Sequence, residues 1–245
     1  KNIDTGAGLE RIAAMVQGKS NNFETDLLFP LIEEAAKLTN SQYGRDEEEN
    51  FSLKVITDHS RAVTFLINDG VIPSNEGRGY VLRRILRRAV RHGRLLGHSE
   101  LFLYKMVDKV VSMMENAYPD LRSNVEHIKK VVKIEEEKFS RTLDQGMQLV
   151  NQEIEKLKAA NITKLDGEVT FKLYDTYGFP YELTEEICQE KGIEISKEEF
   201  EAKMTEQKEK ARAAREVVME KGQDSFIEEF YDRYGATEFS GYTTL

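Results

Sequence analysis

A dense group of arginines is the first feature of this sequence that could do chemistry. Seven arginines, with no acidic residue among them, are Arg78, Arg83, Arg84, Arg87, Arg88, Arg91 and Arg94. A guanidinium group can hold phosphate or carboxylate oxygens through two parallel hydrogen bonds. Because the segment contains no Glu, the usual ion pairs between successive helical turns cannot form within it. We expect these side chains to be available for a polyanion such as RNA, the alternatives being a solvated face or pairing with acidic residues elsewhere in the chain.

A glycine-rich turn near the N-terminus is the second candidate. Gly6 and Gly8 precede a helical pattern that contains Arg11. Glycines let a backbone approach a ligand closely, and a helix N-terminus attracts anions, so Arg11 is a candidate phosphate ligand. The alternative is an ordinary glycine-rich helix start in which an ion pair joins neighbouring turns.

Two polar residues lie in segments rich in turn formers. Asn75 lies in the loop from Pro73 to Gly79, and Asp175 lies in the aromatic run YDTYGFP. Each also has a structural explanation: Asn75 suits an Asx-turn, and Asp175 suits a helix cap. We interpret Cys188 as a buried apolar residue and the four histidines as structural or exposed, because they match no zinc spacing.

Hydrophobic spacing predicts a mainly α-helical fold that positions these residues. We expect helices after the turn in 4–18 and over 26–38, 52–69, about 80–96, 100–116, 122–159, near 182–191 and 197–221. The longest, 122–159, has apolar residues mostly three and four apart, as in a coiled coil or a long bundle element. Loops are expected at 40–50 and 73–79, a compact aromatic segment at 164–180, and strand character at 238–242.

Composition bounds the class of protein. The 245 residues are 40% hydrophobic and 32% charged, which suits a globular protein rich in exposed helix. The net charge of −9 argues against nucleic-acid binding, but the concentration of arginine in one segment indicates a localised anion-binding face. A single cysteine allows no intrachain disulfide, so we expect a cytoplasmic protein, with neither a membrane nor DNA as a partner.

Three segments together resemble the alanyl-tRNA synthetase family, of class II. DTGAGLERIAAMVQG (4–18) is similar to motif 3 of that class, and DHSRAVTFLINDGVIPSNEGRGYVLRRILRRAVRHGRLLG (58–97) is similar to the segment that follows it. FKLYDTYGFPYELT (171–184) is similar to a further signature of the family. The resemblance covers nearly the whole chain and is weakest in 40–51 and 98–163.

The resemblance implies a two-step reaction, in which alanine attacks ATP to form alanyl-adenylate and the tRNA 3′ end then takes the alanyl group. Mg²⁺ would neutralise phosphate charge. By motif position, Arg11 and Gly8 are expected at ATP, and Asp4 and Gly6 at alanine. Asn75 and Asp175 correspond to the family's pair that recognises a G·U wobble pair in the tRNA acceptor stem. The other expected tRNA contacts are Arg78, Arg83, Arg84, Arg87, Arg88 and Arg91.

The same resemblance predicts the organisation of the chain. Residues 1–39 would end a catalytic domain, 40–225 would form a helical bundle that recognises tRNA, and 226–245 would be a linker. Motifs 1 and 2 and an editing domain with its zinc ligands are expected outside this chain. We therefore expect no alanyl-adenylate formation by the chain alone, and no metal in it. The alternative is a non-catalytic helical adaptor that reads no RNA.

Overall fold

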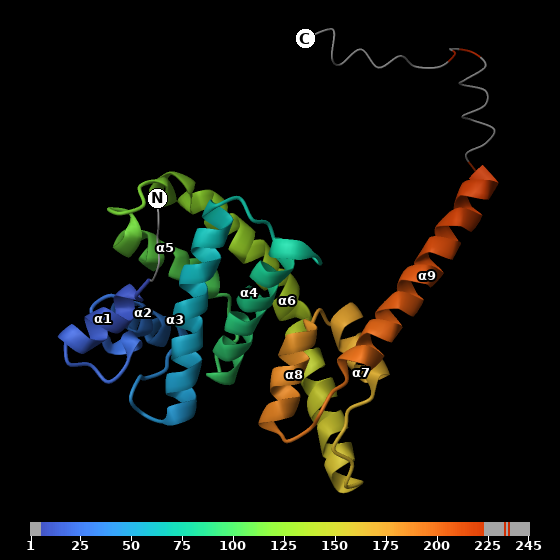
Figure 1. Cartoon of the computed structure of the whole chain (residues 1–245), viewed down its shortest axis with the longest axis horizontal. Coiled ribbons are helices and arrows are strands. Elements are labelled where there is room, and N and C mark those ends of the chain that lie inside the picture. The colour runs from blue at the N-terminus through green and yellow to red at the C-terminus, as the bar shows by residue number, and fades with distance from the viewer. Residues whose placement is uncertain (1–5, 223–232, 234, 236–245) are drawn as a thin grey trace.

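The computed structural model describes residues 6–222, 233 and 235, and its described part consists of helices joined by turns and loops (Figure 1). The prediction of a mainly α fold is confirmed. The α-helices are α1 (Leu9–Val16), α2 (Phe29–Thr39), α3 (Glu47–Asn68), α4 (Gly77–Leu95), α5 (Leu103–Met114), α6 (Asp120–Ala159), α7 (Gly167–Asp175), α8 (Tyr181–Glu190) and α9 (Lys197–Gly222). A short 3₁₀ helix, η1 (Asn22–Glu24), lies between α1 and α2. The strand character expected at 238–242 and the linker at 226–245 fall outside the described residues, apart from positions 233 and 235.

Two groups of helices lie along the longest axis of the molecule (Figure 1). The N-terminal group contains α1 to α5 and the first half of α6, and the C-terminal group contains the rest of α6 with α7, α8 and the start of α9. α2 packs on α3 and α5 within the same hydrophobic core, so the N-terminal segment shares that core with the helices that follow. The proposed boundary at residues 39 and 40 stays a prediction.

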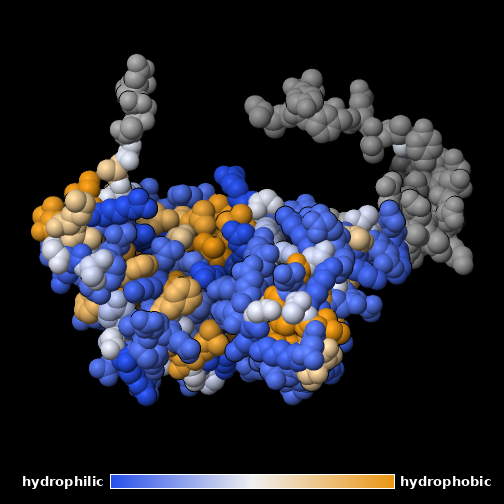
Figure 2. Space-filling model, turned by 60° about the horizontal axis from the view of Figure 1, so that its bottom comes forward, coloured by the Kyte–Doolittle hydropathy of each residue, from blue (hydrophilic) through white to orange (hydrophobic). Residues whose placement is uncertain are grey.

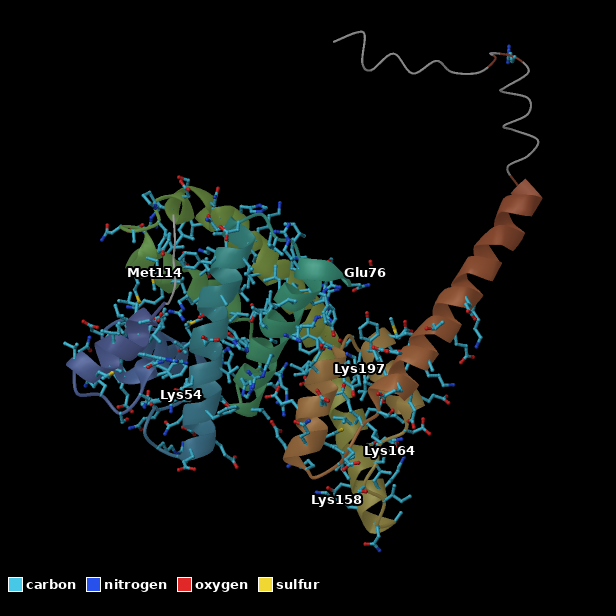
Figure 3. The ribbon with its side chains drawn as sticks, in the orientation of Figure 1. Lys54, Glu76, Met114, Lys158, Lys164 and Lys197 are labelled. Atoms are coloured by element: carbon cyan, nitrogen blue, oxygen red, sulfur yellow. The ribbon has the colours of Figure 1, made fainter. Side chains whose placement is uncertain are left out.

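The long helix α6 connects the two groups. Its 40 residues give it a length of about 60 Å. Beyond Leu121 in the first turn, its large buried apolar residues come in pairs four apart, and the pairs repeat every eleven residues: Ile128 with Val132, Phe139 with Leu143, and Val150 with Ile154. An eleven-residue repeat stays close to the natural period of the α-helix, so one apolar stripe remains on one face along the whole helix. Beyond Lys158 the chain turns back through Lys164 into α7 (Figure 3).

Two consecutive glutamates on α6 are buried, and they serve different helices. Glu136 accepts hydrogen bonds from the backbone N–H groups of Phe102, Leu103 and Tyr104, at 2.8, 2.9 and 3.2 Å. It thus caps the N-terminus of α5, which has no side-chain cap of its own. Burial raises the pKa of Glu136 in spite of these hydrogen bonds. The other glutamate, Glu135, is 3% exposed and faces α4.

Two expected helix starts and one expected segment need correction. α3 begins at Glu47 rather than near residue 52, because Asp46 accepts a hydrogen bond from the backbone N–H of Glu49 at 2.8 Å and caps the helix. The acidic run that suggested a loop favours the first turn of a helix, where negative charge meets the positive end of the dipole. α4 begins at Gly77 instead of residue 80, and the aromatic segment contains the short helix α7.

The outer face of α1 is apolar and open. Leu9, Ile12, Met15 and Val16 are exposed, and Figure 2 shows apolar side chains gathered below the N-terminal trace. The inner face of α1 packs near η1 and buries Ala14, and an ion pair joins Glu10 to Arg61 of α3. None of the described helices is long and apolar enough to cross a membrane.

Candidate nucleic-acid interface

The arginines of α4 are paired with acidic side chains from distant segments. The pairs are Arg83 and Arg87 with Glu135, Arg84 with Glu182, Arg88 with Glu186, Arg91 with Glu190, and Arg94 with Asp144. The expectation that the arginines lack acidic partners is therefore wrong, and the alternative of pairing elsewhere in the chain holds for six of the seven. Arg78 is exposed and, within the described part of the chain, has no hydrogen bond or ion pair.

Acidic residues on α8 match the basic residues on α4 turn by turn. Glu182, Glu186 and Glu190 are four residues apart, so they lie along one face of α8. The pair between Arg88 and Glu186 has two hydrogen bonds of 2.7 Å each. This regular spacing of glutamates is visible in the sequence, and it could have identified them as partners of the arginines of α4.

The environment of Glu186 favours its charged form. Burial by itself would raise the pKa of Glu186, but contacts with His92 and Arg88 and the charge of Arg91 outweigh it and lower the pKa to about 2. Burial lowers the pKa of His92, whose Nδ1 atom lies 3.0 Å from the hydroxyl of Ser52. A cavity of ≈ 300 Å³ lies beside this network and is lined by residues of α3, α4 and α8.

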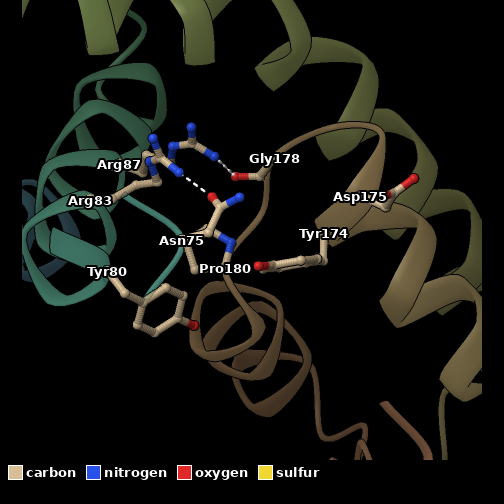
Figure 4. A pocket seen from close by; sticks show the side chains of 8 residues that line it. All are labelled: Asn75, Tyr80, Arg83, Arg87, Tyr174, Asp175, Gly178 and Pro180. Atoms are coloured by element: carbon tan, nitrogen blue, oxygen red, sulfur yellow. Dashed lines mark hydrogen bonds between the residues drawn. The ribbon is translucent and has the colours of Figure 1, made fainter. Parts of the chain in front are cut away.

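A second cavity, of ≈ 230 Å³, brings Asn75 and Asp175 to one place. These two residues are a hundred positions apart in the sequence, and they lie on different sides of the cavity (Figure 4). The remaining residues that line it are Tyr80, Arg83, Arg87, Tyr174, Gly178 and Pro180.

The loop that carries Asn75 is held from two directions. Gly79 lies so close to the loop that a Cβ atom there would stand 2.2 Å from the hydroxyl of Ser74. Arg83 donates hydrogen bonds to Oδ1 of Asn75 and, at 3.3 Å, to the carbonyl oxygen of Pro73. Since a guanidinium group can only donate, the amide atom that faces it must be oxygen. The NH₂ group of Asn75 is left to donate to a ligand.

Asp175 is the last residue of α7, and its carboxylate is exposed. It caps no helix N-terminus, so the expectation of a capping role is wrong. A negative charge at the C-terminal end of a helix opposes the dipole and costs a few tenths of a kcal/mol or more. No hydrogen bond to this carboxylate is found among the described residues. The side chain is therefore free to accept from a ligand, and Figure 4 shows it directed away from the other side chains that line the cavity.

The loop after Asp175 is anchored on α6 and α4. Phe179 is fully buried against Phe139, with ring centroids 5.5 Å apart. Thr142 donates a hydrogen bond of 2.7 Å to the carbonyl oxygen of Tyr177. Arg87 donates to the carbonyl oxygen of Gly178, whose φ of +71° only glycine adopts readily. Burial lowers the pKa of Arg87, and the charge of Glu135 opposes this effect.

The glycine-rich turn lies far from this cavity. α1 is at the opposite end of the long axis from α7 and α8, so Arg11 and Gly8 belong to a separate surface (Figure 1). Gly8 is the N-cap of α1, and the aliphatic part of Arg11 lies beside it. Arg11 is exposed and has no ion pair among the described residues, so the ordinary helix start with a local ion pair is not what the structure shows. Gly6 is exposed, and Asp4 lies outside the described residues.

Cys188 is part of the hydrophobic core. Cys188 is fully buried, and burial raises its pKa to about 11. Among the described residues, no group of three or more His, Cys, Asp or Glu side chains could hold a metal ion. Sequence reasoning missed the roles of Glu135, Tyr80 and Tyr174, which line or support the cavity without belonging to a motif.

Comparison with known proteins defines the class. The model of the class II (A) tRNA synthetases matches residues 1–245, and the chain belongs to this family. The alanine–tRNA ligase of Fusobacterium nucleatum is 79% identical over 242 residues, which are 99% of this chain and 28% of that protein. The alanine–tRNA ligase of Carboxydothermus hydrogenoformans is 48% identical over 246 residues, 100% of this chain and 28% of that protein.

A third relative, the alanine–tRNA ligase of Clostridioides difficile, is 54% identical over 215 residues, 88% of this chain and 24% of that protein. These similarities confirm the family resemblance seen in the sequence. The chain thus spans about a quarter of the length of the relatives it matches.

Proposed function

We propose that this chain is the part of an alanine–tRNA ligase that holds the acceptor stem of its tRNA at the cavity between α4 and α7. The observation that supports this most directly is that Asn75 and Asp175 line the same cavity, together with Arg83 and Arg87. Glu135 and Asp175 together balance the two guanidinium charges, so the cavity offers fixed hydrogen-bond donors and acceptors for base edges rather than an excess of positive charge.

The polar groups at the cavity fit the chemistry of a G·U wobble pair. In such a pair the 2-amino group of guanine has no Watson–Crick partner, and it faces the minor groove, which is wide and shallow in RNA. The carboxylate of Asp175 is free to accept from this donor. The NH₂ group of Asn75 can donate to an acceptor on a base edge, because Arg83 already occupies its oxygen. In a G·C pair one hydrogen of this amino group is engaged by O2 of cytosine, so the carboxylate would meet a donor that is already paired and differently placed.

The surface around α1 would belong to the first step of the reaction. Arg11, which is exposed and without an ion pair among the described residues, is the residue we assign to the ATP phosphates, with Gly8 beside it. Gly6 and Asp4 are assigned to alanine by motif position. In the whole ligase, ATP with Mg²⁺ would activate alanine, and the acceptor stem held at the cavity would present the 3′ end for transfer.

A binding titration tests the proposal. The chain is titrated against two acceptor-stem hairpins that differ only in a G·U or a G·C pair, at low and at moderate salt. We expect tighter binding to the G·U hairpin, by roughly five- to tenfold for one good base contact, and we expect Asp175→Ala to reduce that preference more than it reduces general affinity.

Two other outcomes would contradict the proposal in different ways. Equal, salt-sensitive binding to both hairpins would leave a general RNA-binding surface without discrimination. No binding to either hairpin would favour the non-catalytic adaptor. Pyrophosphate exchange with alanine and ATP, measured on the same preparation, is expected to be undetectable for this chain.

A further inference from the structure

The buried carboxylate of Glu135 lies between the two loops that form the cavity. Its Oε1 atom is 2.9 Å from Nε of Arg83 and 2.9 Å from Nε of Arg87. Arg83 holds the loop of Asn75 through two hydrogen bonds, and Arg87 holds the carbonyl oxygen of Gly178, three residues after Asp175. One oxygen atom thus stands at the centre of a chain of contacts that runs from one loop to the other.

Both arginines depend on this carboxylate. Arg83 and Arg87 have side chains that are only 19% and 12% exposed, and Glu135 is their one acidic partner among the described residues. Without it, two guanidinium groups would face each other at close range in a poorly solvated place, and they would repel each other. Their side chains would move apart, and the loop that each arginine holds would move with it.

We propose that Glu135 is a positioning residue that couples the loop of Asn75 to the loop of Asp175 and thereby sets the spacing on which stem discrimination depends. The part of this inference that concerns discrimination rests on the proposed function, and the coupling of the loops stands on the contacts alone. Glu135 itself is buried and is not among the residues that line the cavity, so it would act on the RNA only through the arginines.

Two substitutions distinguish the effect of the position of the Glu135 carboxylate from the effect of its charge. Glu135→Gln keeps the length of the side chain and removes its charge, whereas Glu135→Asp keeps the charge and withdraws the carboxylate by one methylene. Glu137→Gln is the matched control, because Glu137 lies on the same helix, is 40% exposed and, among the described residues, pairs only with Lys133, at 4.0 Å. Helical content measured by circular dichroism verifies the fold, and if the Gln variant does not fold, the Asp variant supplies both readouts.

The first readout needs no RNA. Amide hydrogen exchange is followed in residues 73–79 and 176–180. We expect both Glu135 variants to speed exchange in both segments together, whereas Glu137→Gln changes neither. Faster exchange in only one segment, or in neither, overturns the coupling.

The second readout is the ratio of affinities for the G·U and G·C hairpins. We expect both Glu135 variants to lower the ratio toward one, a loss of roughly five- to tenfold, while affinity for the G·C hairpin is kept. If Glu135→Asp retains the ratio, and Glu135→Gln tightens binding to both hairpins by the same factor, Glu135 acts through charge alone and the positioning role is wrong. If the unmodified chain itself shows no preference but both segments still loosen together, the proposed function fails and the coupling stands.

Discussion

The ring of Phe179 lies directly against Gly146 of α6, so that a Cβ atom at Gly146 would stand 2.3 Å from the ring. Any side chain at this position would push the ring outward, and the loop behind Asp175 would move with it. Gly146 therefore has a packing role in the middle of a helix, where glycine is otherwise the less stable choice.

We expect Gly146→Ala to destabilise the chain by about 1–3 kcal/mol, although alanine favours the helix by up to about 1 kcal/mol. The free energy of unfolding in urea measures the loss. Combining Gly146→Ala with Phe179→Leu, which replaces the ring by a smaller side chain, should recover part of the lost free energy of unfolding. An increase in stability for Gly146→Ala alone would mean that the ring has room to move.

Gly178 and Gly192 offer a matched comparison. Both have a left-handed backbone, with φ of +71° and +73°, but a Cβ atom at Gly178 would meet Nη1 of Arg87 at 2.5 Å and one at Gly192 would meet nothing within 4 Å. We expect Gly192→Ala to cost about 1 kcal/mol of strain, and Gly178→Ala to cost at least about 1 kcal/mol more because it displaces Arg87. Urea denaturation of both variants checks this, and equal losses would show that the contact with Arg87 is unimportant.

The stability of the chain should fall in acid partly through Glu186. Its pKa is about 2 in the folded chain, below its ordinary value of 4.5. A lowered pKa contributes stability that is complete above the unfolded value and is lost as the pH falls from about 4.5 toward 2, on the order of 3 kcal/mol. His92, whose pKa is also lowered, adds a loss that begins below its ordinary value of 6.5.

The measurement is the unfolding free energy of the chain and of Glu186→Gln between pH 7 and pH 2. The variant should be less stable at neutral pH, and the difference between the two proteins should shrink below pH 4.5. A difference that stays constant down to pH 2 would contradict the lowered pKa of Glu186.

Substitution of Arg78 should mainly change RNA binding, whereas substitution of Arg88 should mainly change the stability of the chain. Arg78 has no ion pair among the described residues, so Arg78→Gln should lower the slope of log affinity against log salt by about one and leave stability unchanged. Arg88 is held by Glu186, so Arg88→Gln should mainly lower the melting temperature. Filter binding of an acceptor-stem hairpin across a salt series, with calorimetry on each variant, measures both effects. A larger change of slope for Arg88→Gln would indicate that RNA displaces Glu186.

The helices were predictable from the sequence, and the partners of the arginines were not. Helical spacing of apolar residues identified every long helix, because the buried stripe of a helix is a local property of the sequence. Glu135 and Glu186 are 48 and 98 positions from the arginines they bind, so no local pattern connects them. Asn75 and Asp175 were identified through family resemblance alone, and only the fold places them at one cavity.

The glutamates that face α4 also affect which polyanions the chain can bind. A peptide of residues 77–95 alone would display its guanidinium groups along one helix and would gather any nucleic acid by counterion release. In the folded chain most of that charge is already taken up by the chain's own carboxylates. The folded chain therefore attracts polyanions only weakly by charge. We expect an RNA stem whose shape fits the cavity to bind better than nucleic acids that offer charge alone.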